Sequence, residues 1–312
     1  MSASPLRLGT RGSALALAQS RSVADALRAA TGLDVELVEI TTAGDRSAAP
    51  VQQLGVGVFV SALRDALLAK EIDFAVHSYK DLPTAPADGL AVAAVPPRAD
   101  ARDALVSAGG RTLSQLPAGA RVGTGALRRM AQLNALGLQL EVVPIRGNVD
   151  SRLRKVAEGE LDAVVLARAG IARLGRADEI TETLDPMLML PAPAQGALAV
   201  ECRVDAVIGD RDLVDVLGSL DDPASRAAVT AERALLATLE AGCSAPVAAL
   251  ADLADGDEGE EIYLRGAVIS PDGSHAVRLS RTGTPADAAR IGRALAADLL
   301  DAGADTVLGA QR

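Results

Sequence analysis

One short α/β pattern occurs twice in the chain, and this repeat constrains the fold more than any other feature. An apolar strand over residues 6–9, a loop and an Ala/Leu-rich helix over 14–30 recur as a strand over 121–123, a Gly-containing loop and a helix over 126–136. In a second repeated pattern, acidic residues precede an apolar run, as is typical of a buried parallel strand. The pattern predicts two similar α/β halves.

Four prolines mark two crossings between these halves: Pro96, Pro97, Pro191 and Pro193. Such stretches between apolar segments are typical of crossover segments. An apolar strand over residues 197–201 follows the second crossing, and we expect it to return to the first sheet. Lobe 1 is therefore predicted to comprise residues 1–96 plus 197–217, and lobe 2 residues 98–192.

The pattern changes in the last third of the chain. A long helix over 223–240 is followed by two antiparallel strands over 261–269 and 275–281, which flank a Pro-Asp-Gly turn, and by a last helix over 286–301. A smaller α+β domain is predicted for residues 218–312. The expected fold class is α/β, with two lobes built on mixed sheets plus this C-terminal domain.

Composition and missing motifs exclude several classes of function. The formal charge is −10 and the aromatic residues are only two Phe and two Tyr, so neither general affinity for nucleic acid nor base stacking is expected. No Lys follows a Gly as a P-loop requires, and no Cys pair has metal-ligand spacing, so no metal is expected. Two cysteines, the lack of a leader-like start and no apolar run of about 18 residues favour a soluble cytoplasmic protein without membrane contact.

A basic stretch is hidden in this acidic chain. Residues 121–176 contain ten basic and five acidic residues, a local net charge of +5. Nearly all the basic residues are Arg, whose planar fork suits carboxylates and phosphates. Arg154, Lys155 and Arg176 are interpreted as solvated helix faces. The remaining arginines predict a site for a ligand with several negative charges.

The placement of these arginines supports that prediction. Arg128 and Arg129 open a helix after a Gly-containing loop, where backbone N–H groups already favour an anion. Arg146 follows the strand over 140–143, and strand ends of this kind of sheet face the crevice where ligands bind. Arg11 occupies the matching loop of the first half, with Ser13 beside it as a neutral donor. We expect the polyanion to lie between the lobes.

A second cluster follows a buried strand that begins after Asp73. The strand delivers His77, Ser78, Lys80 and Asp81 to its C-terminal end, and a proline two residues later prevents a long helix. Polar residues crowded at such an end favour a functional site. Asp81 is suited to receive or stabilise positive charge, and Lys80 to bind an anion. The structural alternative is a capping ion pair.

A third candidate is the cysteine in Gly-Cys-Ser-Ala-Pro at 242–246. Cys243 follows a helix and is predicted to lie in a turn, whereas Cys202 is interpreted as a small core residue. A lone cysteine is by default buried. A thiol near a cationic cleft, however, has a lowered pKa and is nucleophilic.

Taken together, these residues resemble the porphobilinogen deaminase (hydroxymethylbilane synthase) family over essentially the whole chain. The motifs that carry the resemblance are Arg-Leu-Gly-Thr-Arg-Gly-Ser at 7–13, Ala-Val-His-Ser-Tyr-Lys-Asp-Leu-Pro at 75–83, Leu-Arg-Arg at 127–129, Arg-Gly-Asn-Val at 146–149, Pro-Ala-Gln-Gly-Ala at 193–197, Thr-Ala-Glu-Arg-Ala at 230–234 and Gly-Cys-Ser-Ala-Pro at 242–246. Each motif alone is weak, but their order and spacing are highly specific.

The resemblance implies a transferase of porphyrin and haem biosynthesis. Such an enzyme joins four porphobilinogen molecules head to tail into the linear 1-hydroxymethylbilane and releases four ammonia molecules. The chain grows on a covalent dipyrromethane cofactor, and by position the thioether is formed by Cys243. The family also implies a monomer of three domains, with two lobes like a periplasmic-type binding protein and the active cleft between them.

The resemblance also assigns residue roles. Asp81 is implied to be catalytic, because a carboxylate at the pyrrole N–H groups stabilises the positive charge that develops there. Phe59 is implied to belong to a lid. The ligand's acetate and propionate groups explain the excess of arginines. The positions that match cofactor- and substrate-binding residues are Arg11, Ser13, Ser78, Lys80, Thr124, Arg128, Arg129, Arg146, Arg152, Arg173, Gln195, Gly196 and Ala197.

Two features depart from the family pattern. The Gly-rich stretch at 52–58 before Phe59 has no lysine, so a lysine contact from the lid is missing. Gly125 and Ala126 occupy positions where two serines are usual, which leaves only backbone N–H groups as donors. These departures bear on cofactor affinity and elongation rate more than on reaction type.

Two other functions remain open on the residues alone. A two-lobed binding protein for an anionic small molecule explains the arginines and the repeated halves, but not the domain with Cys243. A hydrolase with a cysteine nucleophile requires Cys243 and His77 within hydrogen-bond reach of each other.

Overall fold

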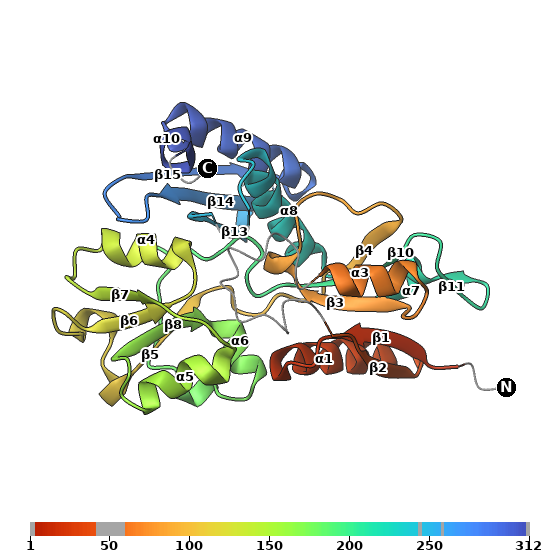
Figure 1. Cartoon of the computed structure of the whole chain (residues 1–312). Helices are drawn as coiled ribbons and strands as arrows, with labels where there is room; N and C mark the ends of the chain where they lie inside the picture. The colour runs from red at the N-terminus through yellow and green to blue at the C-terminus, as the bar shows by residue number, and fades with distance from the viewer. Residues whose placement is uncertain (1–3, 42–59, 243–244, 257–258, 310–312) are drawn as a thin grey trace. The chain divides into compact units, whose positions relative to one another are not determined.

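The structure is a computed structural model that describes residues 4–41, 60–242, 245–256 and 259–309 (Figure 1). The chain forms two compact units. Unit 1 contains residues 1–98 and 197–226, and unit 2 contains residues 99–196 and 227–312. The first two of the three boundaries between the units, at 98/99 and 196/197, fall close to the prolines that mark the two predicted crossings.

Unit 1 is built on a five-stranded mixed sheet. Its strands, in order across the sheet, are β2 (Val35–Glu39), β1 (Leu6–Thr10), β3 (Phe74–Ser78), β10 (Leu198–Arg203) and β4 (Leu90–Ala94). β1 is parallel to β2 and β3, whereas β10 is antiparallel to β3 and β4. The prediction that the segment after the second crossing returns to the first sheet is confirmed.

Helices cover both faces of this sheet. α1 (Ala14–Thr31) and α7 (Leu213–Gly218) bury one face, and α3 (Ser61–Leu68) buries the other. The hydroxyl of Ser13 accepts a hydrogen bond from Ala16 N at 3.3 Å, so Ser13 caps α1 as predicted. The remaining elements of unit 1 are the 3-10 turn η2 (Tyr79–Asp81) and the hairpin strands β11 (Val207–Ile208) and β12 (Arg211–Asp212).

Unit 2 contains a second five-stranded sheet with the same strand pattern. Its order is β7 (Glu141–Pro144), β6 (Arg121–Thr124), β8 (Ala163–Ala167), β5 (Asp103–Ser107) and β9 (Glu182–Thr183). β6 is parallel to β7 and β8, and β5 is antiparallel to β8 and β9. Since β6 and β8 correspond to β1 and β3, the predicted duplication is confirmed.

The helices of this second sheet again lie on both faces. Leu133 of α4 (Leu127–Ala135) packs with Val122 and Val165 on one face. Side chains of α5 (Val149–Ala157) and α6 (Arg168–Arg173) pack on the other. Short 3-10 segments connect these elements: η3 (Ala108–Gly110), η4 (Leu113–Gln115) and η5 (Ala177–Glu179).

A third, antiparallel sheet completes unit 2. It consists of β13 (Val247–Gly256), β14 (Gly259–Ile269) and β15 (Ala276–Gly283). One face is buried by α8 (Pro223–Thr238), α9 (Ala288–Asp301) and α10 (Ala304–Gly309), and η6 (Pro285–Asp287) precedes α9. α8 begins in unit 1 and continues into unit 2. The smaller α+β part is confirmed, with β13 as a strand that the sequence pattern missed.

The other face of the third sheet packs on α4. Ala248, Leu250 and Ala267 bury apolar surface together with Ala131 and Leu190. At the edge of this contact the amide of Asn134 donates to the carbonyl of Pro271 at 2.7 Å, which holds the Pro-Asp-Gly turn against the end of α4. The helix that opens with the arginine pair is thus fixed to the third sheet.

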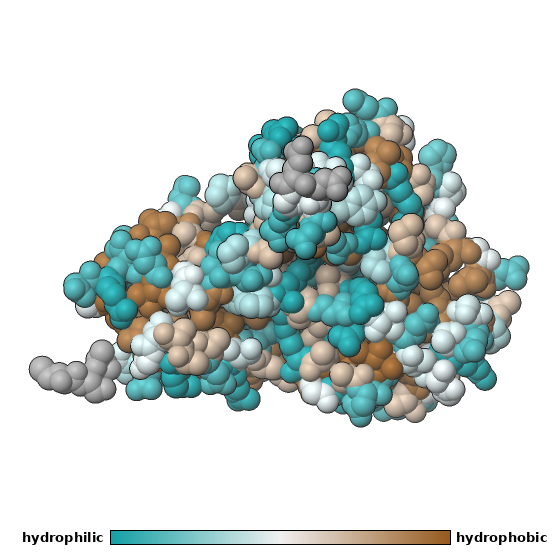
Figure 2. All heavy atoms as spheres, turned by 180° about the vertical axis from the view of Figure 1, so that it is seen from behind, coloured by the Kyte–Doolittle hydropathy of each residue, from teal (hydrophilic) through white to brown (hydrophobic). Residues whose placement is uncertain are grey.

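The described part of the chain contains no helix that is long and apolar enough to span a membrane. On the face shown in Figure 2, brown apolar areas form separate patches among teal polar areas. The large apolar side chains with high exposure include Met187, Val204 and Val207.

Candidate active site

Unit 1 gathers its candidate residues at the carboxyl ends of β1 and β3. These strands are parallel neighbours, so both ends lie at the same edge of the sheet. Arg11 and Ser13 follow β1, and Ser78, Lys80 and Asp81 end or follow β3. The structure therefore brings these five predicted residues to one edge of unit 1.

The segment that carries Asp81 is fixed on several sides. The Ser78 hydroxyl lies 3.0 Å from the amide nitrogen of Gln19 on α1. The backbone N–H of Tyr79 donates to the carbonyl of Ala197 at 3.0 Å, which gives buried Ala197 a backbone role. Asp81 itself is exposed on η2. A solvent-facing carboxylate thus stands on a turn whose neighbours are held in place.

In unit 2, Arg128 and Arg129 form a buried ion cluster with Asp103. Their exposed fractions are only 4% and 5%, and Asp103 is fully buried. Arg128 Nη2 donates to Asp103 Oδ2 at 2.8 Å, and Arg129 Nη2 donates to Oδ1 at 2.8 Å. Burial alone would raise the pKa of Asp103, but the two guanidiniums and the Gln195 amide hold it at about 2. At neutral pH the Asp103 carboxylate is therefore ionised between the two guanidinium groups.

Gln195 and Gly196 connect the second crossing to this cluster. The Gln195 amide donates to Asp103 Oδ1 at 2.8 Å and to the carbonyl of Ala101 at 2.7 Å. Gly196 has a φ of +88°, and a Cβ there would meet the carbonyl oxygen of Ala99 at 2.4 Å, so only glycine fits. Arg173 Nη2 donates to the carbonyl of Gly196 at 2.6 Å. These residues lie together within unit 2.

Arg152 and Arg173 have a different environment from the paired arginines. Both are half-buried, and neither has a carboxylate partner among the described residues. Burial, and then the charges of Arg129 and Arg146, lower the pKa of Arg152 to about 10. Burial also lowers the pKa of Arg173. An uncompensated, half-buried cation is costly, so this part of unit 2 is suited to bind an anion.

The side chains interpreted as solvated helix faces behave differently. Lys155 Nζ lies 2.5 Å from Glu160, and Arg176 pairs with Asp150 at 2.7 Å and with Glu179. Arg154 is exposed. Local acids therefore satisfy two of these three residues.

The loops after β6 and β7 complete the unit 2 set. Thr124 is fully buried, and its hydroxyl accepts from Ala126 N at 3.3 Å, so it shapes the loop before α4. Arg146 is exposed after β7. A Cβ at Gly125 would lie 2.8 Å from the carbonyl oxygen of Ile145 and 3.4 Å from the Arg152 guanidinium nitrogens. Glycine at this position leaves room for the close approach of Arg152.

Two predicted residues, Phe59 and Cys243, lie outside the described residues, as does the Gly-rich stretch before Phe59. Cys202 is fully buried, and burial raises the pKa of its thiol to about 11, so its predicted place in the core is confirmed. His77 is buried and faces Glu201. No group of three or more metal-ligating side chains occurs in the described ranges.

Asp103 and Glu201 are two buried carboxylates that sequence reasoning missed. Asp103 opens the apolar strand β5, and Glu201 interrupts the apolar strand β10. A charged residue within a fully buried strand was the available signal, because such a residue needs a partner.

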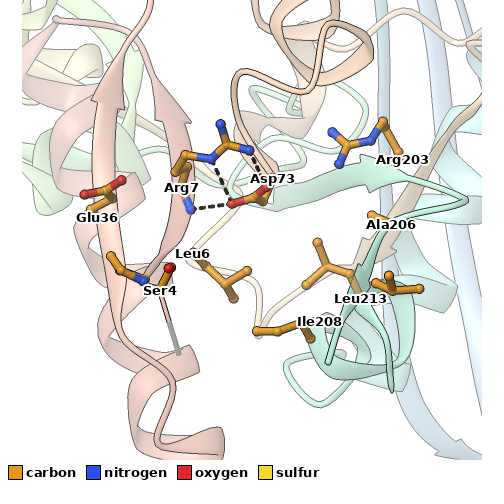
Figure 3. Close-up of a pocket in the computed structure, with 11 residues that line it drawn as sticks. Ser4, Leu6, Arg7, Glu36, Asp73, Arg203, Ala206, Ile208 and Leu213 are labelled. Carbon is orange, nitrogen blue, oxygen red and sulfur yellow. Dashed lines mark hydrogen bonds and ion pairs between the residues drawn. The ribbon is translucent and has the colours of Figure 1, made fainter. Parts of the chain in front are cut away.

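A pocket of about 320 Å³ in unit 1 is lined by residues at the amino ends of β1 and β3, among them Leu6, Arg7 and Asp73 (Figure 3). Asp81 follows the opposite, carboxyl end of β3. Its main polar feature is the ion pair between Arg7 Nη2 and Asp73 Oδ1 at 2.8 Å, which joins the second residue of β1 to the residue before β3. Arg203 also lines it and donates to the carbonyls of Leu67 and Ile72. Because it lies at the amino ends of β1 and β3, the pocket is separate from the candidate site.

The fold and the two residue sets define an α/β protein whose second sheet carries half-buried arginines suited to an anionic ligand. Two family profiles match the chain. "Porphobilinogen deaminase, dipyromethane cofactor binding domain" matches residues 6–208, and "Porphobilinogen deaminase, C-terminal domain" matches residues 226–301. The chain belongs to the porphobilinogen deaminase family.

Curated relatives match almost the full length. A porphobilinogen deaminase of Nocardia farcinica is 60% identical and aligns with 97% of this chain and 88% of that protein. One of Mycobacteroides abscessus is 57% identical over 97% of this chain and 99% of that protein. One of Mycobacterium tuberculosis is 58% identical over 96% of this chain and 97% of that protein.

Solved structures give more distant likenesses. The methionine-binding protein MetQ aligns with 69% of this chain and 89% of its own, at 14% identity and a TM-score of 0.43. A periplasmic substrate-binding protein of Coxiella burnetii aligns with 73% and 96%, at 14% identity and a TM-score of 0.45. The α/β fold class of this chain rests on its own sheets.

Proposed function

We propose that this chain joins four porphobilinogen molecules into 1-hydroxymethylbilane, with loss of ammonia at each addition, on a dipyrromethane group attached through Cys243. Membership of the deaminase family supports this reaction. The observation on the structure that carries it is the pair of half-buried guanidiniums, Arg152 and Arg173, without carboxylate partners among the described residues. Porphobilinogen and its oligomers supply the matching acetates and propionates.

The residues of unit 2 fit such a ligand. Arg152 and Arg173 would each accept a carboxylate in place of the missing counter-ion, and a forked guanidinium binds it through two parallel hydrogen bonds. The Arg129 charge that lowers the pKa of Arg152 belongs to the same positive region. A bound dipyrromethane would supply a nucleophilic pyrrole carbon. We assign Arg128, Arg146, Gln195 and Gly196 to the support of this region.

In unit 1, we assign the chemistry to Asp81. Loss of ammonia and carbon–carbon bond formation place positive charge on pyrrole nitrogens. A carboxylate that accepts their N–H hydrogen bonds stabilises that charge and can hold a proton between steps. The exposed position of Asp81 on η2 leaves its carboxylate accessible to substrate. Arg11, Lys80, Ser13 and Ser78 supply positive charge and hydroxyl groups at the same edge of the sheet.

Three further assignments belong to this proposal. The chain is proposed to work as a cytoplasmic monomer. The division into residues 1–96 plus 197–217, 98–192 and 218–312 is supported by the three larger sheets, each of which has an apolar cluster on at least one face. Phe59 is proposed to belong to a lid.

Intact-mass measurement tests the function most directly. Purified protein should be heavier than its sequence by two pyrrole units, and brief exposure to porphobilinogen should add a ladder of further units. Cys243→Ser should abolish the increase, whereas Cys202→Ser, a matched change at the buried thiol, should retain it. An unmodified mass in active protein would falsify the attachment.

A second measurement tests Asp81. Asp81→Ala should retain the added mass but lower the steady-state rate by roughly 10²- to 10³-fold, since it removes stabilisation of charge in the transition state. Asp88→Ala, an exposed aspartate further along the same loop, should leave the rate unchanged. Near-normal turnover of Asp81→Ala would remove Asp81 from the mechanism.

The binding-protein alternative makes a different prediction. It requires reversible binding of an anionic molecule with no covalent increase in mass and no ammonia release. It is not favoured, because the family match extends through the C-terminal domain that a two-lobed binding protein does not need.

A further inference from the structure

Glu201 is a buried carboxylate that the proposed chemistry does not use. Its side chain is 2% exposed. Arg64 Nη2 donates to Oε1 at 2.8 Å, and Arg64 Nε lies 3.2 Å from both oxygens. His77 Nε2 lies 3.2 Å from Oε2, a close approach without hydrogen-bond geometry. Burial raises the pKa of Glu201, but His77 and Arg64 outweigh that effect and lower it, so the carboxylate is ionised. An ionised buried group in a small core is retained at a cost in stability.

The three partners come from three different elements of unit 1. Glu201 lies on β10, His77 on β3 and Arg64 on α3. The pairing of β10 with β4 shifts register between Val200 and Glu201, and such an irregularity re-aims a side chain. Glu201 shares the α3-covered face of the sheet with His77 and Ala75, and Ala75 packs with Leu63 and Ile72. One carboxylate therefore ties a helix to two strands.

β3, α3 and β10 all adjoin the segment that carries Asp81. His77 is the fourth residue of β3, and η2 with Asp81 follows directly after β3. Val60, at the start of α3, packs with Leu82 and Ala199, so the position of α3 bears on the residue next to Asp81. Helix α3 has only eight residues and no side-chain hydrogen bond at its N-cap. Its placement depends on apolar contacts and on the ion pair of Arg64.

We propose that Glu201 is a positioning residue for the reaction, because its contacts with His77 and Arg64 hold the turn that presents Asp81. On the α1 face the Gln19–Ser78 contact holds the same strand end, so the turn is fixed from both faces of the sheet. A shift of a reacting group by about 1 Å can cost roughly 10²-fold in rate. The inference rests on the catalytic role proposed for Asp81.

Steady-state kinetics of Glu201→Gln holoenzyme test this role. The change keeps the side-chain volume and removes the charge that orders Arg64 and His77. We expect kcat to fall by at least about tenfold, with unchanged cofactor mass and a smaller change in KM. Asp73→Asn is the matched control, because Asp73 also binds an arginine through two nitrogens but at the opposite end of β3. It should leave kcat within about twofold.

A double-mutant cycle separates positioning from general destabilisation. If Glu201 acts through Asp81, then Glu201→Gln in an Asp81→Ala background should lower the residual rate no further. Equal reductions in both backgrounds would overturn the inference and leave the role of Asp81 intact. Normal turnover of Asp81→Ala alone would instead overturn the proposed function.

A second variant covers the case in which Glu201→Gln does not fold. Arg64→Gln removes the more exposed partner, whose side chain is 17% exposed, and leaves Glu201 facing His77. It should lower kcat in the same direction, and the effect should vanish in the Asp81→Ala background. A kcat equal to that of the unmodified holoenzyme would contradict the inference.

Discussion

Replacing Asp103 by Asn perturbs the arginine cluster at its centre. Asn has nearly the shape of Asp but no charge, and its NH₂ group donates where the carboxylate accepted. Asp103 receives hydrogen bonds from Arg128, Arg129 and Gln195, and all four residues are at most 5% exposed. The substitution therefore leaves two buried guanidiniums without their counter-ion.

The size of the effect follows from the burial and the charges. Removal of one partner from a buried ion pair costs about 3–5 kcal/mol, because the remaining charge stays desolvated. The ionisation of Asp103 gives a smaller value: a fall in its pKa from 3.8 to about 2 corresponds to about 2 kcal/mol. Asn resembles the protonated acid, but its NH₂ group also places a hydrogen-bond donor where a carboxylate oxygen accepted. We therefore expect a loss of about 2–5 kcal/mol in the free energy of unfolding.

The pH dependence has a definite sign. Because folding lowers the pKa of Asp103, its ionised form stabilises the protein fully above the unfolded value of 3.8, and this contribution is lost as pH falls toward about 2. The difference in stability between the unmodified protein and Asp103→Asn should therefore be constant near neutral pH. It should shrink as the pH falls from 3.8 to 2.

Urea unfolding followed by far-UV circular dichroism measures this effect, since the chain has no Trp. Asp287→Asn is the matched control: Asp287 also pairs with an arginine through two nitrogens, but the pair with Arg290 is exposed. We expect the control to leave the urea midpoint unchanged and Asp103→Asn to lower it clearly. Equal midpoints for the two variants would refute the reasoning.

Two further predictions concern unit 2. Arg152→Gln should reduce the fraction of protein that carries the added cofactor mass. It should not lower the urea midpoint, because it removes a cation that Arg129 and Arg146 repel. The control Arg154→Gln, on the exposed side of the same helix, should change neither the loaded fraction nor the midpoint. Full loading of Arg152→Gln would show that its charge does not bind the ligand. Gly273→Ala should destabilise the protein by about 1–3 kcal/mol more than Gly159→Ala. Both glycines have a φ of +75°, but only a Cβ at Gly273 would clash with the backbone, since it would lie 2.4 Å from the Ala135 nitrogen. Urea midpoints that agree for the two variants would contradict the close contact with α4.

Much of the fold could be predicted because its signals are local. The Gly-Thr loops, the Ser13 cap and the apolar strands before Ser78 and after Ala197 lie within a few residues of the elements they define. Strand β13 was missed because Val247–Gly256 is rich in Ala and Asp rather than in β-branched residues. Its strand conformation comes from pairing with β14 along its full length.

The buried carboxylates could not be assigned, because their partners are distant in the chain. Asp103 lies 25 and 26 residues from its two arginines, and Glu201 lies 137 residues from Arg64. The sequence contains 41 acidic residues, and a pairwise contact has no local pattern that selects one of them. The predicted ligand-binding residues, by contrast, were found through motifs, and their roles stay predictions until the variants above are measured.

The arginine excess also shows why a count of charges along the sequence overestimates the number of arginines available to bind a ligand. The net charge of +5 over residues 121–176 treats every arginine as available. In the folded chain Asp103, which lies outside that stretch, pairs with Arg128 and Arg129, and Asp100 lies 3.5 Å from Arg168. What distinguishes Arg152 and Arg173 is therefore not their number but the absence of a carboxylate partner in the described structure. A ligand's carboxylates gain most where the fold supplies a half-buried cation and withholds its counter-ion, and these two positions meet that condition.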